Sequence, residues 1–246
     1  MRRIALLAAA LLAAAALSIP PSKAASTPAA VRILTVGDSI TAAGQWQTEL
    51  DRLLTATSVP HTISNLAVGG TRCDYWPPRI GALLAQYQPD LVVLACGTND
   101  DANATCFGES CTGWAWRSVV EQVHTWRPTS PAKTLPALIQ YSDPLIAPQW
   151  LLDYEPRTND TIYGQFGKYP PAWFAGIVDL QRVPATADFL DDGGIHPTER
   201  GYRVVGQLMY RAAAPAMGWP APAEPAPCSL YGHRRGYPRP AYTPCP

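Results

Sequence analysis

The sequence predicts an α/β domain in which helices cover both faces of a parallel sheet. Strand-like and helix-like segments alternate along the chain, which is typical of parallel strands joined by helical crossovers. The segment 91–96 is apolar at nearly every position, as expected for a strand buried on both faces. The chain has 246 residues, 47% of them hydrophobic, which is enough for one well-buried domain.

The N-terminal half of the domain supplies two strands and two helices. Residues 31–36 form an apolar run that we assign to the first strand. Residues 45–57 carry apolar side chains three and four positions apart, which predicts an amphipathic helix. A second strand is expected at 61–68. A short helix at 80–87 should end before Pro89, because the residue preceding a proline disfavours helical geometry.

The C-terminal half continues the same alternation. After the buried strand at 91–96, residues 114–126 have helical spacing. The segments 135–141 and 174–180 are expected to be a fourth and a fifth strand. Residues 200–213 form an amphipathic pattern that predicts the last helix of the domain.

Two long segments, 101–112 and 144–171, do not fit this alternation and are expected to be inserted loops. Loops of this length are usually functional or disordered. The second insertion is rich in aromatic residues, which line a substrate cleft or, as we expect here, pack the loop onto the domain. These aromatic residues are Trp150, Tyr154, Tyr163, Phe166 and Tyr169.

Residues 1–24 have the three parts of a secretory signal peptide. Two arginines follow Met1, an apolar stretch rich in Ala and Leu covers residues 4–19, and small residues precede a cleavage site near Ala24. The alternative is a membrane anchor, but about 16 apolar residues are short for a membrane span. We therefore expect a secreted, extracellular protein that does not insert stably into a membrane.

The mature protein is expected to consist of a domain at 25–218 and a Pro-rich extended tail at 219–246. Removal of the leader leaves 16 basic and 19 acidic residues, a formal charge of −3. Such a chain lacks the basic surface that nucleic acid or an anionic membrane requires. The Cys and His residues show no metal-site spacing, so we expect neither a metal nor another cofactor.

The six cysteines are an even number, and disulfides persist in an exported protein. Many pairings are possible, and the sequence alone does not choose among them. Proximity favours Cys106 with Cys111 and Cys228 with Cys245, the latter pair tying the tail, which would leave Cys73 for Cys96.

Four short motifs lie at strand ends or at a helix start, and the first two are rich in glycine. The triplet Gly-Asp-Ser at 37–39 ends the first strand. It is either an ordinary helix cap or the position of a nucleophile, Ser39. The motif NLAVGGT at 65–71 follows the second strand, and its paired glycines free the backbone to turn and to expose an N–H group to a ligand.

The other two motifs carry an amide and an imidazole. The motif CGTND at 96–100 delivers Asn99 to the carboxyl edge of the sheet, where its side chain can donate a hydrogen bond. In the motif DDGGIHPTERGY at 191–202, His196 lies just before the last helix, with acidic residues upstream. Open parallel sheets bind ligands at this edge, so we expect the four motifs to meet there.

This ordered set of motifs resembles the SGNH hydrolase superfamily, the GDSL-like esterases and lipases, over residues 31–213. The resemblance implies a flavodoxin-like three-layer α/β/α sandwich with a five-stranded parallel sheet. It also implies that Ser39 is the nucleophile and His196 the general base.

The resemblance further implies an oxyanion hole with three donors. They are the backbone N–H of Ser39, the backbone N–H of Gly70 and the side-chain amide of Asn99. Gly70 is preferred to Gly69 because it lies five residues after Asn65, the usual spacing in this motif.

The sequence departs from the family at the acid of the triad. The family places it three residues before the histidine, where this chain has Gly193. We expect Asp192 to take the role, because two adjacent glycines allow the backbone to bulge. Asp191 and a backbone carbonyl are the alternatives, since the group need only orient His196 and stabilise its imidazolium.

These residues predict a monomeric, secreted serine esterase that works through an acyl-enzyme intermediate. Its expected substrates are short acyl esters, acetyl esters above all, on a small molecule or on a polysaccharide. One alternative is an enzyme of the lipase or lysophospholipase type that acts on longer acyl chains. The other is a non-catalytic protein that uses the same fold to bind carbohydrate or a surface.

Overall fold

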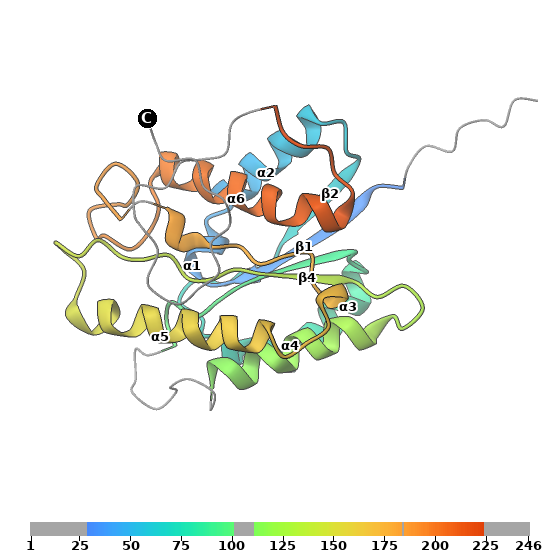
Figure 1. The fold of residues 1–246 in the computed structure, drawn as a ribbon, viewed down its shortest axis with the longest axis horizontal. Helices are drawn as coiled ribbons and strands as arrows, with labels where there is room; N and C mark the ends of the chain where they lie inside the picture. Colours follow the sequence, from blue (N-terminus) through green and yellow to red (C-terminus); the bar gives the residue numbers. More distant parts are fainter. Residues whose placement is uncertain (1–28, 101–110, 184, 224–246) are drawn as a thin grey trace, which may run out of the picture.

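Four parallel strands form the central sheet in the order β2-β1-β3-β4, and helices cover both of its faces (Figure 1). A computed structural model of the chain describes residues 29–100, 111–183 and 185–223. The strands are β1 (Val31–Gly37), β2 (His61–Asn65), β3 (Leu91–Ala95) and β4 (Lys133–Pro136).

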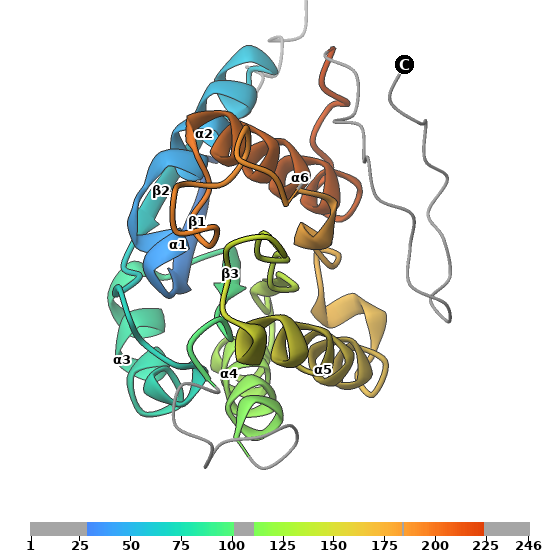
Figure 2. The same ribbon diagram turned by 90° about the vertical axis from the view of Figure 1, so that its left-hand side faces the viewer.

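The helices form two layers, one on each side of the sheet (Figures 1 and 2). One layer contains α2 (Gln45–Ala56) and α6 (Glu199–Met217). The other layer contains α3 (Pro77–Tyr87), α4 (Thr112–Trp126) and α5 (Gln149–Phe166). The predicted three-layer α/β/α architecture is therefore confirmed. Short helical segments complete the described part: α1 (Ser39–Ala42) and the 3-10 turns Cys73–Tyr75, Pro171–Trp173 and Leu180–Arg182.

Strand β3 is buried on both faces, as its apolar sequence predicts. Leu91 and Val93 belong to the core beneath α2 and α6. Val92 and Leu94, which point the other way, belong to the core beneath α3 and α4. The two cores explain why nearly every position of this strand must be apolar, because successive side chains enter opposite layers.

The expected fifth strand at 174–180 is wrong. This segment runs beside β4 but contacts it only through isolated parallel bridges, such as the one between Ala137 and Val178. Gly176 interrupts the pairing with a positive φ of 147°, and a side chain there would lie 2.4 Å from the carbonyl oxygen of Ala212 in α6. Close contact with α6 thus replaces regular strand geometry.

The insertion at 144–171 is not the expected loop, because most of it forms helix α5. Its buried residues include Leu151, Tyr154, Thr158 and Ile162, which recur three and four positions apart. Pro156 lies inside the helix and obscures this periodicity. A proline in the interior of a helix costs about 3 kcal/mol of helix stability. Burial of the apolar face of α5 therefore outweighs the unfavourable helix propensity of Pro156.

The aromatic residues of this insertion mostly pack against the domain, as expected. Tyr154 is fully buried, and Tyr163, Phe166 and Tyr169 are partly buried against the core of the α3–α4 layer. Trp150 differs, because it is among the exposed large apolar side chains of the described chain.

Cys73 and Cys96 form a disulfide, which confirms this pair. Cys111 is also disulfide-bonded. The other cysteines, Cys106, Cys228 and Cys245, lie outside the described residues, as do the signal peptide at 1–24 and most of the predicted loop at 101–112.

The start of the predicted tail is part of the packed domain. Helix α6 ends at Met217 and is capped by Gly218, which has a φ of 68°, and the next residue, Trp219, is buried against Tyr210. The remainder of the tail, residues 224–246, lies outside the described residues. Among the described helices, none combines the length and apolar content needed to span a membrane.

Candidate active site

Strand β1 ends where the chain must pass very close to β3. A side chain at Gly37 would place its Cβ 2.0 Å from the carbonyl oxygen of Ala95, so only glycine fits at this position. Asp38 follows as the N-cap of α1, and its side chain accepts a hydrogen bond from the backbone N–H of Ile40 at 3.1 Å. Ser39 is therefore held at the first turn of a helix at the carboxyl edge of the sheet.

Asp38 is buried beside the candidate nucleophile. Burial raises the pKa of its carboxyl to about 6, and hydrogen bonds from Ile40 and Thr98 partly oppose this rise. Thr98 belongs to the loop after β3, so the carboxyl joins the end of β1 to the loop that carries Asn99. The triplet at 37–39 thus acts as a helix cap and also presents Ser39.

Ser39 and His196 meet, although they are 157 residues apart in the sequence. The distance between Ser39 Oγ and His196 Nε2 is 2.9 Å, which is within hydrogen-bonding reach. His196 lies just before α6, whose N-cap Thr198 accepts a hydrogen bond from the backbone N–H of Gly201. The helix start therefore holds the imidazole at the edge of the sheet.

Asp191, and not the expected Asp192, faces the other nitrogen of the imidazole. The distance from Asp191 Oδ2 to His196 Nδ1 is 3.5 Å, and the backbone N–H of His196 donates to Asp191 Oδ1 at 3.3 Å. Asp192 is exposed. By position, therefore, Asp191 and not Asp192 is the candidate for the acid.

The turn at 191–194 explains this position of Asp191. The backbone N–H of Gly194 donates to the carbonyl of Asp191 at 2.8 Å, and the backbone N–H of Asp191 donates to the carbonyl of His196 at 2.8 Å. Gly194 adopts a φ of 68°, which favours glycine. The turn therefore closes over both glycines and folds the first aspartate, not the second, back onto the histidine.

The chain after β4 supports this turn from behind. The side chain of Gln140 donates to the carbonyl of Ile195, and the backbone N–H of Asp143 donates to the carbonyl of Gly194 at 2.8 Å. Ser142 lies between them and is held by Glu155 of α5, whose carboxyl accepts from the Ser142 backbone N–H at 3.0 Å. Burial raises the pKa of Glu155 to about 7, and the hydrogen bonds from Ser142 oppose the rise.

Gln140, Asp143 and Glu155 are not predicted as site residues from the sequence. Gln140 falls in the strand expected at 135–141, and Glu155 falls in the segment 144–171, which was expected to be a loop. The helical spacing of Leu151 and Ile162 around Pro156 was the available signal for α5. No motif marks these three residues. Gln140 and Asp143 hydrogen-bond to backbone carbonyls beside His196, and Glu155 holds Ser142, which lies between them in the sequence.

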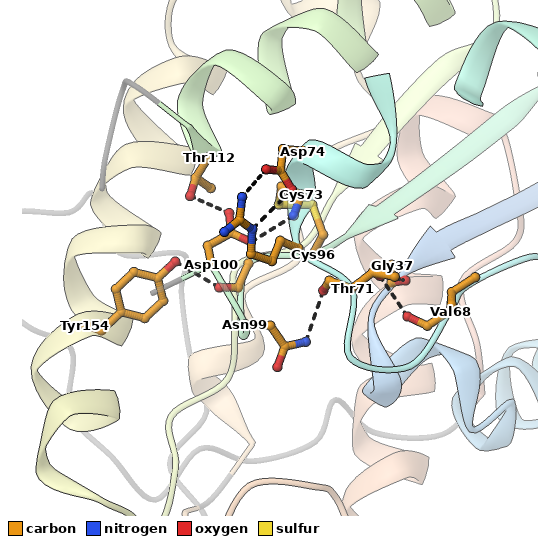
Figure 3. The surroundings of a disulfide bond; sticks show 12 residues. Gly37, Val68, Thr71, Cys73, Asp74, Cys96, Asn99, Asp100, Thr112 and Tyr154 are labelled. Carbon is orange, nitrogen blue, oxygen red and sulfur yellow. Dashed lines mark hydrogen bonds and ion pairs between the residues drawn. A yellow bond between two sulfur atoms is a disulfide. The ribbon is translucent and has the colours of Figure 1, made fainter. Parts of the chain in front are cut away.

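The two remaining motifs also lie beside Ser39. A side chain at Gly69 would place its Cβ 3.8 Å from Ser39 Cβ, so the first of the paired glycines lies beside the serine. The side-chain amide of Asn99 donates to the carbonyl of Thr71 at 3.0 Å, as Figure 3 shows. Gly70 lies between these contacts with a φ of 74°. The structure therefore gathers all four motifs at one edge of the sheet.

Residues 35–204, more than half of the chain, match the family described as "GDSL-like Lipase/Acylhydrolase family". The chain belongs to the GDSL-like lipase/acylhydrolase family. This GDSL-like protein is accordingly a serine hydrolase that acts on ester bonds. No curated protein matches its sequence.

Solved structures share the fold of this GDSL-like hydrolase at low sequence identity. A family 3 carbohydrate esterase of Clostridium thermocellum is 20% identical, with a TM-score of 0.63 over 77% of this chain and 98% of that chain. The esterase EstA from Pseudoalteromonas sp., inhibited by monoethylphosphonate, is 16% identical, with a TM-score of 0.59 over 76% and 98% of the two chains. TesA is 22% identical, with a TM-score of 0.56 over 75% and 99%.

Proposed function

We propose that Ser39, His196 and Asp191 form a catalytic triad that hydrolyses carboxylic esters through an acyl-enzyme intermediate. The observation that carries this proposal is the 2.9 Å contact between Ser39 Oγ and His196 Nε2. A serine hydroxyl is a weak nucleophile until a base accepts its proton, and this contact supplies the base. The carboxylate of Asp191 orients the imidazole and stabilises its protonated form.

Each half of the reaction uses His196 twice. When Ser39 attacks the ester carbonyl, its proton passes to Nε2, and His196 then gives this proton to the departing alcohol. The acyl group remains on Ser39 Oγ. A water molecule then gives its proton to Nε2 and attacks the acyl carbon, and the proton returns to Ser39 as the acid leaves.

Three donors are proposed to stabilise the negative charge on the carbonyl oxygen during each attack. They are the backbone N–H groups of Ser39 and Gly70 and the side-chain amide of Asn99. Support comes from Gly69, the neighbour of Gly70, whose added Cβ would lie 3.8 Å from Ser39 Cβ, and from Asn99, whose side chain is held by the same loop at Thr71. Donors that are already oriented need no reorganisation when charge develops.

Asn99→Ala is expected to lower kcat about 10²- to 10³-fold, because loss of one oxyanion donor removes stabilisation of the transition state. KM for a model ester should change much less. Steady-state kinetics, with circular dichroism to confirm folding, check this result. Gln207→Ala is the matched control, because it removes an amide from the α2–α6 layer. Equal kcat values in the two variants would exclude Asn99 from the oxyanion hole.

We further propose that the substrate is a short acyl ester, in particular an acetyl group on a carbohydrate. The protein would cleave this ester outside the cell, after removal of its own signal peptide. The side chains of His196 and Asp191 are 44% and 45% exposed, so the site is open enough for a bulky sugar alcohol. The fold shared with the family 3 carbohydrate esterase of Clostridium thermocellum supports this substrate class.

A second candidate is an enzyme for longer acyl chains, and exposed apolar residues beside the histidine turn favour it. Leu145 and Ile146 are 89% and 51% exposed. Ile146 packs closely on Gly194, where an added Cβ would lie 2.6 Å from Ile146 Cγ1. An acyl chain leaving the site in this direction would cover them. The position of Asp191, 3.5 Å from His196 Nδ1, argues against the non-catalytic alternative, whose support was the unusual spacing of the acid.

Two measurements test the proposed function. The first compares hydrolysis of p-nitrophenyl acetate and p-nitrophenyl palmitate by the parent protein, and we expect higher kcat/KM for the acetate. A preference for palmitate would favour the second candidate. The second treats the protein with a serine-reactive phosphonate and locates the adduct by peptide mass spectrometry. We expect the adduct on Ser39, and labelling elsewhere would contradict the proposed nucleophile.

A further inference from the structure

A disulfide joins the two loops that carry the proposed side-chain and glycine donors. Cys73 lies three residues after Gly70, and Cys96 lies three residues before Asn99. The two cysteines are 23 residues apart in the sequence and both are buried. Figure 3 shows the bond between these loops, together with Asn99 and Thr71 in its surroundings. The crosslink therefore connects the two donor loops close to the donors themselves.

Asp100 makes a second connection at the same place. Its Oδ1 accepts a hydrogen bond from the backbone N–H of Cys73 at 2.8 Å, and its Oδ2 accepts from the hydroxyl of Thr112 at the start of α4 (Figure 3). Its own backbone N–H donates to the carbonyl of Gly97 at 3.1 Å. We call the Cys73–Cys96 disulfide and the Asp100 carboxylate the loop clamp.

The sheet order explains why these loops need a clamp. Strand β1 lies between β2 and β3, so the loops after β2 and β3 are not neighbours through strand hydrogen bonds. They meet beyond the end of β1, where Ser39 lies. The hydroxyl of Thr71 also donates to the carbonyl of Gly37 at 3.2 Å, which ties the first loop to the end of β1. The loop clamp thus spans the strand that carries the nucleophile.

We propose that the loop clamp positions the donors of Gly70 and Asn99 for the oxyanion, so that Cys73, Cys96 and Asp100 are positioning residues for catalysis. The inference rests on the proposed function. A misplacement of about 1 Å costs as much as 10²-fold in rate, and preoriented donors act mainly on the transition state. Loss of the clamp should therefore lower kcat with little change in KM.

The main test is the double variant Cys73→Ala/Cys96→Ala, assayed with p-nitrophenyl acetate well below its unfolding temperature. We expect kcat to fall about tenfold or more, KM to change less than about threefold, and the rate of phosphonate labelling at Ser39 to fall with kcat. Leu84→Ala is the control, because it destabilises the same core but leaves the disulfide intact. Unchanged kcat in the double variant, or an equal loss in Leu84→Ala, would overturn the proposal.

A coupling experiment asks whether the clamp acts through Asn99. Asn99→Ala is introduced into the parent and into the double cysteine variant. If the clamp positions Asn99, the asparagine contributes less to kcat when the clamp is absent. Asn99→Ala should therefore lower kcat by a clearly smaller factor in the double cysteine variant than in the parent. Losses that multiply independently in the combined variant would contradict the proposed role.

Substitutions of Thr112 test the clamp with the disulfide intact, should the cysteine variant fail to fold. Thr112→Val removes the hydroxyl that donates to Asp100 but keeps the shape of the side chain, whereas Thr112→Ser keeps the hydroxyl. We expect about a threefold loss of kcat or more in the valine variant and recovery in the serine variant. Equal kcat in both would count against the clamp. A parent protein without esterase activity would instead refute the proposed function itself.

Discussion

Ser39→Ala is expected to lower kcat for ester hydrolysis by about 10⁶-fold, the effect of removing the nucleophile of a serine hydrolase. We expect the variant to keep the fold, because the hydrogen bond between the serine hydroxyl and His196 lies at the edge of the sheet and not in a hydrophobic core. Steady-state hydrolysis of p-nitrophenyl acetate measures the loss. Thermal unfolding of the variant, expected to match the parent, confirms that the fold is retained.

Variants of His196 provide a second test of the same reaction. His196→Ala should be as inactive as Ser39→Ala, and the double variant should be no worse than either, because nucleophile and base act as one unit. Phosphonate labelling should disappear in Ser39→Ala. Activity that survives in this variant at the parental rate would show that another group, or a contaminant, hydrolyses the ester.

Asp191→Asn is expected to lower kcat about 10²- to 10⁴-fold, whereas Asp192→Asn should leave it within about twofold of the parent. The asparagine keeps the size of the side chain but lacks the charge that stabilises the imidazolium and fixes its tautomer. The two variants are matched, because they make the same chemical change at adjacent exposed positions.

The contrast between these variants decides the identity of the acid. A loss confined to Asp192→Asn would reinstate the assignment expected from the sequence. Full activity in both would leave a serine–histidine pair oriented by a backbone group. Ester hydrolysis assays and thermal unfolding of both proteins separate an effect on catalysis from an effect on the turn, whose hydrogen bonds also involve Asp191.

The candidate site residues could be predicted from the sequence where a motif lies next to a clearly predicted strand or helix. The nucleophile triplet follows an apolar strand, and the histidine precedes an amphipathic helix, so both had to lie at the edge where parallel sheets bind ligands. The buried strand β3 was equally clear, because apolar residues at successive positions indicate two covered faces. The Cys73–Cys96 pair was expected as the one left after the other four cysteines were paired by proximity, although other pairings were open.

Three features depended on contacts between distant segments. Helix α5 was not predicted because Pro156 interrupts its helical pattern. Its apolar face is stabilised by packing against the core of the α3–α4 layer, which the local sequence does not reveal. The fifth strand failed because Gly176 packs on the backbone of Ala212. The supporting role of Glu155 could not be seen without α5, since it depends on a contact with Ser142.

The sequence by itself determined the fold class and the family and pointed to Ser39 and His196 as the proposed pair that exchanges the proton, because these follow from periodicity and from motifs that keep their order. Only the tertiary structure decided which aspartate faces the histidine ring. Asp191 and Asp192 are chemically identical neighbours, and the choice between them depends on how the turn at Gly194 closes. Gln140 and Asp143, which follow the carboxyl end of β4, support that closure by donating hydrogen bonds to the carbonyls of Ile195 and Gly194.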